Sequence, residues 1–471
     1  MTAWLAPTLA PAEQINAQVI VPASKSLTNR YLILASLSKA PSVIKNPLRA
    51  RDTALMTAAL RTFGIEITEL PTQDGWRVAP PGSRKLHGGT IYAGLAGTVM
   101  RFIPVLAALA HGKTVIDADA QAYLRPMDTT ISSLRALGVE IAGNGAAGKR
   151  LPLEIHGTGS VAGGAITIDA SSSSQFISAL LLTAPRFERG LTLKHCGTSL
   201  PSKPHIEMTL ALLRECGAQV RADDHAKSPV WHVAPGEIQL PEVEVESDLS
   251  NAGPFLAAAM VCGGQITIPH WPRKTTQPGA QFAAIFCRQG AKIDFVDADS
   301  LRLTGPRKIA PLDLDCSAIG ELVPTLAAVC AFAQGSSALR NIGQLRGHET
   351  DRLQALVTEL NKVGVNAQIS GDDLIIVPPP NQDPAQTIDP QSPPAVQDLS
   401  RGSGYRGAAL ASYADHRMAT FGAILGLKIA GITVDHIETT AKTLPNFPQL
   451  WAQMIQQSTN QRNTEYCKDE I

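Results

Sequence analysis

The chain has 471 residues, of which 44% are hydrophobic and 17% are charged. This composition is typical of a globular protein and excludes a disordered or fibrous one, and the length predicts two or more domains. Lysine plus arginine and aspartate plus glutamate both number 41. The broad positive charge of a nucleic-acid-binding protein is therefore excluded, and any anion site must be local.

The seven cysteines and the apolar runs narrow the class of protein further. No two cysteines have CxxC spacing, which argues against a zinc ribbon or a redox dithiol. Cysteines in apolar runs such as "LAAVCAF" indicate small buried side chains and a reducing cytoplasm. No basic, apolar leader opens the sequence and no stretch of about 18 apolar residues follows. We therefore expect a cytoplasmic protein with no membrane partner.

Six helices rich in small apolar residues recur along the chain, and each follows a polar or glycine-bearing turn. They begin near Ser24, Ala96, Ser172, Ser250, Ala318 and Ala414. The first five are spaced by roughly 70 to 78 residues, which indicates an internal repeat. The last gap is longer because it holds a Pro-rich segment near 378–404, which we expect to be an exposed insertion.

Short strands and second helices lie between these six helices. Runs such as "AITIDA" and "QITIPH" predict strands, and "TTISSLRALG" and "LQALVTELNKVG" predict helices with a left-handed glycine cap. The pattern predicts six units in two lobes, with lobe 1 at 24–245 and lobe 2 at 1–23 plus 246–455. Residues 456–471 form a polar tail that we expect to be frayed.

The polar residues at the helix starts are of types that bind phosphate and carboxylate. Glycine lets the backbone approach an anion, hydroxyls donate to phosphate oxygens, and arginine clasps a carboxylate with two bonds. Any one of them alone reads as an N-cap or a surface charge. Their recurrence at helix N-termini predicts an anion site. Besides residues assigned below, the helix starts supply Thr98, Arg101, Asp415 and His416, and the stretch "LPSKPH" adds Lys203.

The ordered motifs of the chain resemble those of the 5-enolpyruvylshikimate 3-phosphate synthase (3-phosphoshikimate 1-carboxyvinyltransferase) family of enolpyruvyl transferases. They are "PASKSLTNR", "LAGTVMRF", "SSSQFISALL", "LPSKPH", "GHETDRL", "ADHRM" and "AKTLPNF". The resemblance implies an α/β fold of two lobes, each with three βαβαββ units, and an active site in the interdomain cleft. It also implies an enzyme without metal or other cofactor that transfers the enolpyruvyl group of phosphoenolpyruvate to the 5-hydroxyl of shikimate 3-phosphate. Phosphate is released, in the shikimate route to chorismate and aromatic amino acids. We expect a monomer, because a closed two-lobe unit needs no partner.

The resemblance assigns a role to each matching residue. Shikimate 3-phosphate is expected to contact Lys25, Ser26, Arg30, Ser173, Ser174, Gln175, Ser202, Glu321 and His348. Phosphoenolpyruvate is expected to contact Lys25, Gly97, Arg125, Gln175, Arg352, Arg417 and Lys442. Glu321 would orient or deprotonate the shikimate hydroxyl, and Glu349 and Lys25 are candidates for moving protons on the phosphoenolpyruvate side. Coupled groups share protons, so the individual assignments stay open.

Four positions depart from the pattern of the best-known bacterial members. Glu321 replaces a common aspartate, His348 a lysine that contacts substrate, Leu95 an asparagine before "AGT", and Gln344 lies near a usual asparagine. A histidine is fully charged only below about pH 6.5 unless an anion raises its pKa. We therefore expect affinity for shikimate 3-phosphate to fall above neutral pH; titrations with the same affinity from about pH 6 to about 8.5 would contradict this.

Two other functions remain as alternatives. The sister enzyme that transfers enolpyruvate to UDP-N-acetylglucosamine commonly carries a reactive cysteine, and the corresponding stretch here, "DADAQAYLRPMD", has none. A non-catalytic anion-binding homologue would have lost its acid, base or arginines, because a fold alone does not fix function. Lys25, Glu321 and Glu349 are all retained, together with the arginines.

Overall fold

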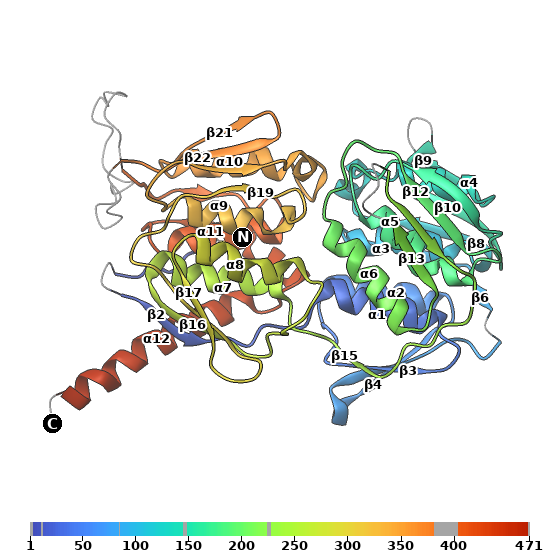
Figure 1. The fold of residues 1–471 in the computed structure, drawn as a ribbon, viewed down its shortest axis with the longest axis horizontal. Coiled ribbons are helices and arrows are strands. Elements are labelled where there is room, and N and C mark those ends of the chain that lie inside the picture. Colours follow the sequence, from blue (N-terminus) through green and yellow to red (C-terminus); the bar gives the residue numbers. More distant parts are fainter. Residues whose placement is uncertain are drawn as a thin grey trace. The chain divides into compact units, whose positions relative to one another are not determined.

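The computed structural model describes residues 3–10, 13–83, 85–144, 148–223, 228–380 and 404–469. The chain forms two compact units, coloured along the sequence in Figure 1. Lobe 1 is Ala23–Glu246, and lobe 2 is Met1–Pro22 together with Ser247–Ile471. The Pro-rich segment expected near 378–404 lies almost entirely outside the described residues.

Three buried helices form the centre of lobe 1. They are α1 (Lys25–Leu37), α3 (Gly97–Ala107) and α5 (Gln175–Thr183), and they pack against one another. Every residue of α3 is buried, since a helix that is apolar on nearly all sides needs protein neighbours all round. The other helices of this lobe are α2 (Arg51–Thr62), α4 (Asp128–Ala136) and α6 (Lys203–Glu215).

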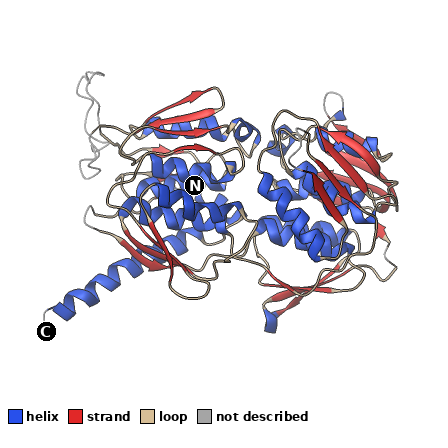
Figure 2. Cartoon of the chain, viewed as in Figure 1, coloured by secondary structure: helices blue, strands red, loops and turns tan. Residues whose placement is uncertain are grey.

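Sheets lie around the helices of lobe 1 (Figure 2). Their strand orders are β15-β3-β5-β4, β6-β8-β10-β9 with β7 also on β8, and β11-β12-β14-β13. In each sheet a parallel pair is followed by antiparallel pairs. The strands are β3 (Ser42–Lys45), β4 (Glu66–Leu70), β5 (Gly75–Ala79), β6 (Leu86–His87), β7 (Thr90–Tyr92), β8 (Ala110–Asp117), β9 (Glu140–Asn144), β10 (Arg150–Thr158), β11 (Gly164–Ile168), β12 (Leu191–His195), β13 (Val220–Asp223), β14 (Val230–Val233) and β15 (Val243–Glu244).

Lobe 2 is also built on three central helices. These are α7 (Leu249–Cys262), α9 (Val323–Cys330) and α11 (His416–Gly426), which pack together and whose residues are all buried. The other helices of lobe 2 are α8 (Gln281–Arg288), α10 (Arg352–Lys362) and α12 (Phe447–Asp469). Some predicted site residues lie at the N-termini of central helices, such as Lys25 on α1 and Arg417 on α11.

The sheets of lobe 2 have the orders β17-β18-β16-β2, β19-β20-β22-β21 and β1-β24-β23. Strand β2 (Ile15–Gln18) pairs in parallel with β16 (Gly264–Ile268), so the N-terminal segment completes a sheet of lobe 2. The remaining strands are β1 (Trp4–Leu5), β17 (Lys292–Phe295), β18 (Leu301–Thr304), β19 (Asp313–Asp315), β20 (Ser337–Arg340), β21 (Asn366–Ser370), β22 (Asp373–Val377), β23 (Ala409–Leu410) and β24 (Thr433–Val434). Because the third sheet has three strands among the described residues, six full repeat units stay a prediction.

The local predictions are confirmed at the six helices and at the glycine caps. Gly138, Gly217, Gly290 and Gly364 follow second helices with φ between 83° and 101°, a conformation that glycine adopts without strain. One expectation at the fifth helix needs correction. Glu321 lies in a 3-10 turn, η6 (Gly320–Leu322), just before α9.

The prediction of a frayed tail is wrong, because α12 continues through residues 456–469. Its first turns are anchored by Phe447 and Trp451, which are buried and whose rings contact Phe255. Once a helix is nucleated by such packing, each added residue costs little, so a polar sequence can prolong it.

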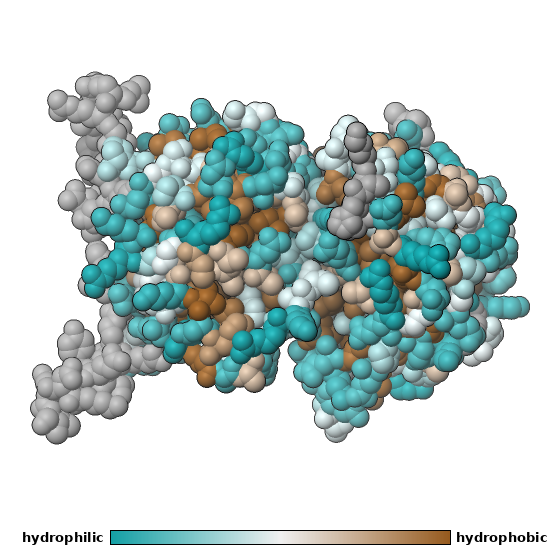
Figure 3. All heavy atoms as spheres, in the orientation of Figure 1, coloured by the Kyte–Doolittle hydropathy of each residue, from teal (hydrophilic) through white to brown (hydrophobic). Residues whose placement is uncertain are grey.

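The face of the molecule in Figure 3 carries mostly hydrophilic side chains with scattered hydrophobic ones. Within the described ranges, no helix combines the length and the apolar character needed to cross a bilayer. Those ranges also contain no group of three or more His, Cys, Asp or Glu side chains arranged to hold a metal ion.

Burial separates the six cysteines with described side chains into two classes. Cys196 and Cys287 are exposed, whereas Cys216, Cys262, Cys316 and Cys330 are buried and free. Burial raises the pKa of Cys262 to about 12 and that of Cys330 to about 11, which removes almost all reactive thiolate at pH 8. We expect the four buried thiols to react with a chromogenic disulfide only after denaturation. Fast labelling of Cys262 or Cys330 in the native protein, located by peptide mass spectrometry, would contradict this.

Candidate active site

Arg352 is the centre of a buried ion-pair network in lobe 2. It is the first residue of α10, next to the N-cap Asp351, and its side chain is almost fully buried. The guanidinium donates to Asp415 Oδ2 at 2.7 Å and Oδ1 at 3.2 Å, and to Glu349 Oε2 at 2.9 Å. Burial alone would lower the pKa of Arg352, but the charges of Asp415 and Glu349 outweigh it and raise the pKa. The arginine is therefore permanently charged and fixed in direction.

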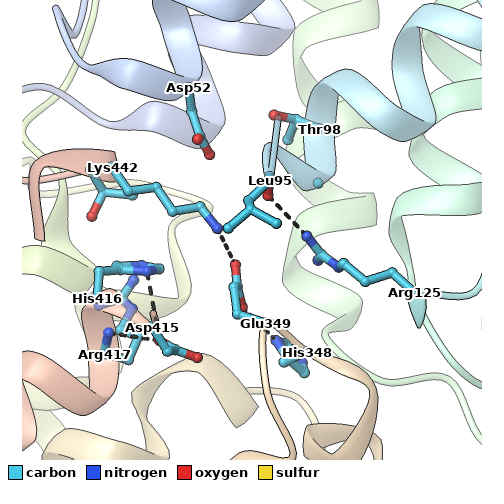
Figure 4. Close-up of polar contacts among 12 residues, drawn as sticks. Asp52, Leu95, Thr98, Arg125, His348, Glu349, Asp415, His416, Arg417 and Lys442 are labelled. Carbon is cyan, nitrogen blue, oxygen red and sulfur yellow. Dashed lines mark hydrogen bonds and ion pairs between the residues drawn. The ribbon is translucent and has the colours of Figure 1, made fainter. Parts of the chain in front are cut away.

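Asp415 joins this network to the start of α11. It is fully buried, it is the N-cap of α11, and its Oδ1 accepts from the Arg417 N–H at 2.8 Å. The Asp415 carboxylate thus accepts hydrogen bonds both from the N-terminus of α11 and from the Arg352 guanidinium. Figure 4 shows Asp415 directed towards the backbone of Arg417 and close to His416.

Glu349 lies between two cations. Besides Arg352, it pairs with Lys442, the last residue of the 3-10 turn η9 (Ile437–Lys442), and the two side chains point at each other in Figure 4. Lys442 is buried, so Glu349 neutralises part of the positive charge that two elements bring to one place.

Arg417 and Glu321 are both held by Ser250 at the start of α7. The Ser250 hydroxyl donates to Glu321 Oε1 at 2.6 Å, and Arg417 Nη1 donates to the Ser250 carbonyl at 2.8 Å. Arg417 is 8% exposed, and among the described residues no carboxylate pairs with it. A buried arginine without a counter-charge is costly, which favours an anionic ligand beside it.

A second cluster of cations lies in lobe 1 around Gly97, the first residue of α3. Arg101 Nη1 donates to Gln175 Oε1 at 3.2 Å, and Arg125 Nη1 donates to the Leu95 carbonyl at 3.1 Å (Figure 4). A Cβ on Gly97 would lie 2.9 Å from Arg125 Nη2, 3.0 Å from Arg101 Nη1 and 3.2 Å from Gln175 Oε1. Glycine is needed here because two guanidinium groups approach the helix start closely.

Arg125, like Arg417, is a buried arginine that could bind an anionic ligand. It is buried, its Nε lacks a hydrogen-bond partner, and no carboxylate of the described residues pairs with it. Arg125 in lobe 1 and Arg417 in lobe 2 are thus both buried without a carboxylate partner among the described residues.

Lys25 and Arg30 are placed differently on α1. Lys25 pairs with the buried Asp52 at 3.3 Å, a partner that the sequence did not suggest. Arg30 is 1% exposed, and its guanidinium donates to Ser26 O, Ser178 Oγ, Thr209 Oγ1 and His205 O. Those contacts tie α1 to α5 and α6, so Arg30 has a packing role whatever else it binds.

The structure also shows the surroundings of the predicted serines and of two residues that differ from the family pattern, His348 and Gln344. Ser173 Oγ accepts from the Gln175 N–H at 3.2 Å, Ser174 is buried at the start of α5, and Ser202 has φ 53° just before α6. His348 Nδ1 lies 3.1 Å from Arg352 Nη1 and 3.9 Å from Glu349 Oε2. Gln344 Nε2 donates to the Ser317 carbonyl at 3.3 Å.

Ser250 and Asp52 were not predicted as site residues, and Arg101 and Asp415 were named at helix starts without a role towards either substrate. Ser250, Asp415 and Arg101 belong to starts of the repeated helices, so their position was the available signal. Asp52 stands in the first turn of α2, where a carboxylate reads only as favourable to the helix N-terminus.

A family model described as EPSP synthase (3-phosphoshikimate 1-carboxyvinyltransferase) matches residues 9–451. The chain belongs to this family. Two curated relatives named 3-phosphoshikimate 1-carboxyvinyltransferase agree with the match. The one from Kocuria rhizophila is 46% identical over 462 residues and covers 96% of each chain. The one from Bifidobacterium longum is 43% identical over 463 residues, or 96% of this chain and 98% of the relative.

Solved structures of the EPSP synthase family confirm the predicted α/β fold class. Two EPSP synthase structures from Acinetobacter baumannii each give a TM-score of 0.74, at 22% and 21% identity. They cover 96% of this chain and 97% and 98% of their own. The roles expected for individual EPSP synthase site residues stay predictions.

Proposed function

We propose that this chain transfers the enolpyruvyl group of phosphoenolpyruvate to the 5-hydroxyl of shikimate 3-phosphate and releases phosphate. The family match over residues 9–451 carries the proposal, and the two curated relatives bear the name of this activity. Both substrates are polyanions. The buried arginines Arg125 and Arg417 suit such ligands, because each is a fixed cation without a carboxylate partner among the described residues.

The reaction needs a base for the hydroxyl and an acid for the methylene carbon of phosphoenolpyruvate. The hydroxyl oxygen bonds to C2 while a proton adds to C3, and the tetrahedral adduct then loses phosphate and a C3 proton to restore the double bond. We assign Glu321 to the hydroxyl, supported by the Ser250 hydrogen bond that fixes Glu321 Oε1. Glu349 and Lys25 are assigned to protons on the phosphoenolpyruvate side.

We assign the remaining residues by substrate. The shikimate 3-phosphate set is Lys25, Ser26, Arg30, Ser173, Ser174, Gln175, Ser202, Glu321 and His348. The phosphoenolpyruvate set is Lys25, Gly97, Arg125, Gln175, Arg352, Arg417 and Lys442. The fork from Arg352 to Asp415 supports this second set, because it fixes a guanidinium for a carboxylate or phosphate ligand.

The test is to mix the purified protein with phosphoenolpyruvate and either shikimate 3-phosphate or UDP-N-acetylglucosamine, and to follow phosphate release and product mass. The proposal expects an enolpyruvyl adduct only from shikimate 3-phosphate. Turnover only with the nucleotide sugar would favour the sister activity, and absence of turnover with both would favour a non-catalytic homologue.

We also propose that the protein acts as a cytoplasmic monomer without nucleic-acid or membrane partners. Support comes from the equal numbers of acidic and basic residues and from four buried, unpaired thiols. Light scattering after size exclusion tests the monomer; a mass near twice 49.9 kDa would contradict it.

A further inference from the structure

The turn before α11 has an unusual backbone. It joins β23 to α11, and within it Tyr413 has φ 56° and Ala414 has φ 53°. Two consecutive left-handed residues that carry a Cβ are rare, because the Cβ crowds the following carbonyl. Such a turn persists only where surrounding contacts determine it. It stands directly before Asp415, the partner of Arg352.

Two carboxylates hold this turn. The Tyr413 hydroxyl donates to Glu359 Oε1 at 2.6 Å, and the Ala411 N–H donates to Glu359 Oε2 at 3.3 Å. The Ser412 N–H donates to Asp435. The hydrogen bonds on Glu359 come from both a side chain and the backbone of the turn, so they fix its position and its conformation.

Glu359 lies on α10, seven residues after Arg352 and therefore on the same helix face. Its side chain is fully buried, and Lys362 Nζ lies 2.8 and 2.9 Å from its two oxygens. The charge is thus compensated. One face of α10 holds residues 411–415 at two points, Glu359 to Tyr413 and Arg352 to Asp415.

We propose that Glu359 and Tyr413 are positioning residues for phosphoenolpyruvate binding. Their hydrogen bond holds the left-handed turn that aims Asp415 at Arg352 and fixes the start of α11, from which Arg417 extends. They act through Asp415, Arg352 and Arg417, and the proposal rests on the proposed function.

The test is Tyr413→Phe, which removes only the hydroxyl. The control is Tyr405→Phe, which also removes a lobe 2 tyrosine hydroxyl that donates a hydrogen bond, here to the Ala331 carbonyl at 2.8 Å. Tyr405 is buried, whereas Tyr413 is 37% exposed. We expect Tyr413→Phe to raise KM for phosphoenolpyruvate about tenfold, the scale of one lost hydrogen bond to a charged group. KM for shikimate 3-phosphate and the melting temperature should match those of the control. A merely structural role would lower the melting temperature without separating the two KM values.

Adding Ala414→Gly to Tyr413→Phe sharpens the test. Glycine adopts φ near 53° without strain, so the double variant should recover most of the lost affinity for phosphoenolpyruvate. Equal KM values in Tyr413→Phe and the control, or no recovery with glycine, would overturn this inference alone. Absence of turnover by the unaltered chain would overturn the proposed function and this inference with it.

Discussion

Asp415→Asn should lower the turnover of phosphoenolpyruvate and shikimate 3-phosphate about a hundredfold and the free energy of unfolding by about 3 kcal/mol, the scale for a broken buried ion pair. Asparagine has the same shape and still caps α11. It cannot balance the charge of Arg352, which donates to both oxygens of Asp415 at 2.7 and 3.2 Å. The guanidinium would turn towards Glu349 and lose its direction.

The control for this change is Asp351→Asn. Asp351 is also an N-cap, and its Oδ1 accepts from the Gln354 N–H at 3.0 Å, but it is exposed. Steady-state kinetics and urea unfolding of both variants separate the loss of an N-cap charge from the loss of the Arg352 partner. Equal effects of the two substitutions would contradict a special role for the pair of Asp415 and Arg352.

Gly97→Ala should raise KM for phosphoenolpyruvate between about tenfold and a hundredfold, the cost of displacing binding groups by about 1 Å. The new methyl group would lie within about 3 Å of Arg125 and Arg101. Neither guanidinium can move away freely, because Arg125 is hydrogen-bonded to the Leu95 carbonyl and Arg101 to the Gln175 side chain. Arg101 Cζ also lies over the Phe176 ring, 5.4 Å from its centroid. Because α3 and its core contacts are retained, the protein should remain folded.

Gly236→Ala is the matched control for Gly97→Ala, since a Cβ on Gly236, also in lobe 1, would meet nothing within 4 Å. The resemblance of the motif "LAGTVMRF" to the family also implies that glyphosate, a phosphoenolpyruvate mimic, binds at this turn, and we expect it to lose more affinity than the substrate in Gly97→Ala. Competition kinetics measure both constants. An unchanged KM, or equal losses for inhibitor and substrate, would contradict the crowding argument.

The elements of the fold could be predicted from the sequence because their signals are local. Gly138 and Gly364 follow their helices with φ 83° and 88°, as a helix pattern ending in glycine indicates. The end of α12 could not be predicted, since its helical state after residue 456 depends on packing at Phe447 and Trp451 rather than on its own sequence.

The site could be predicted as a set of residue types but not as pairs. Arg352 and Asp415 are 63 residues apart, and Ser250 and Glu321 are 71 apart. No spacing states which carboxylate an arginine meets across such distances. Arg30 shows that a motif can also hide a packing role. Its motif indicates anion binding, but its side chain is 1% exposed and donates to Thr209 and other neutral groups.

The parallel pairing of β2 with β16 sets an order of events during synthesis. Ile15 leaves the ribosome early, but its partner Gly264 follows only after the whole of lobe 1. At ordinary elongation rates this delay is roughly 10 to 50 s. Lobe 1 can reach its native state within that time, whereas β2 waits as an unpaired strand. The segment that contains β2 is therefore made before lobe 1 and takes its place in the fold after it.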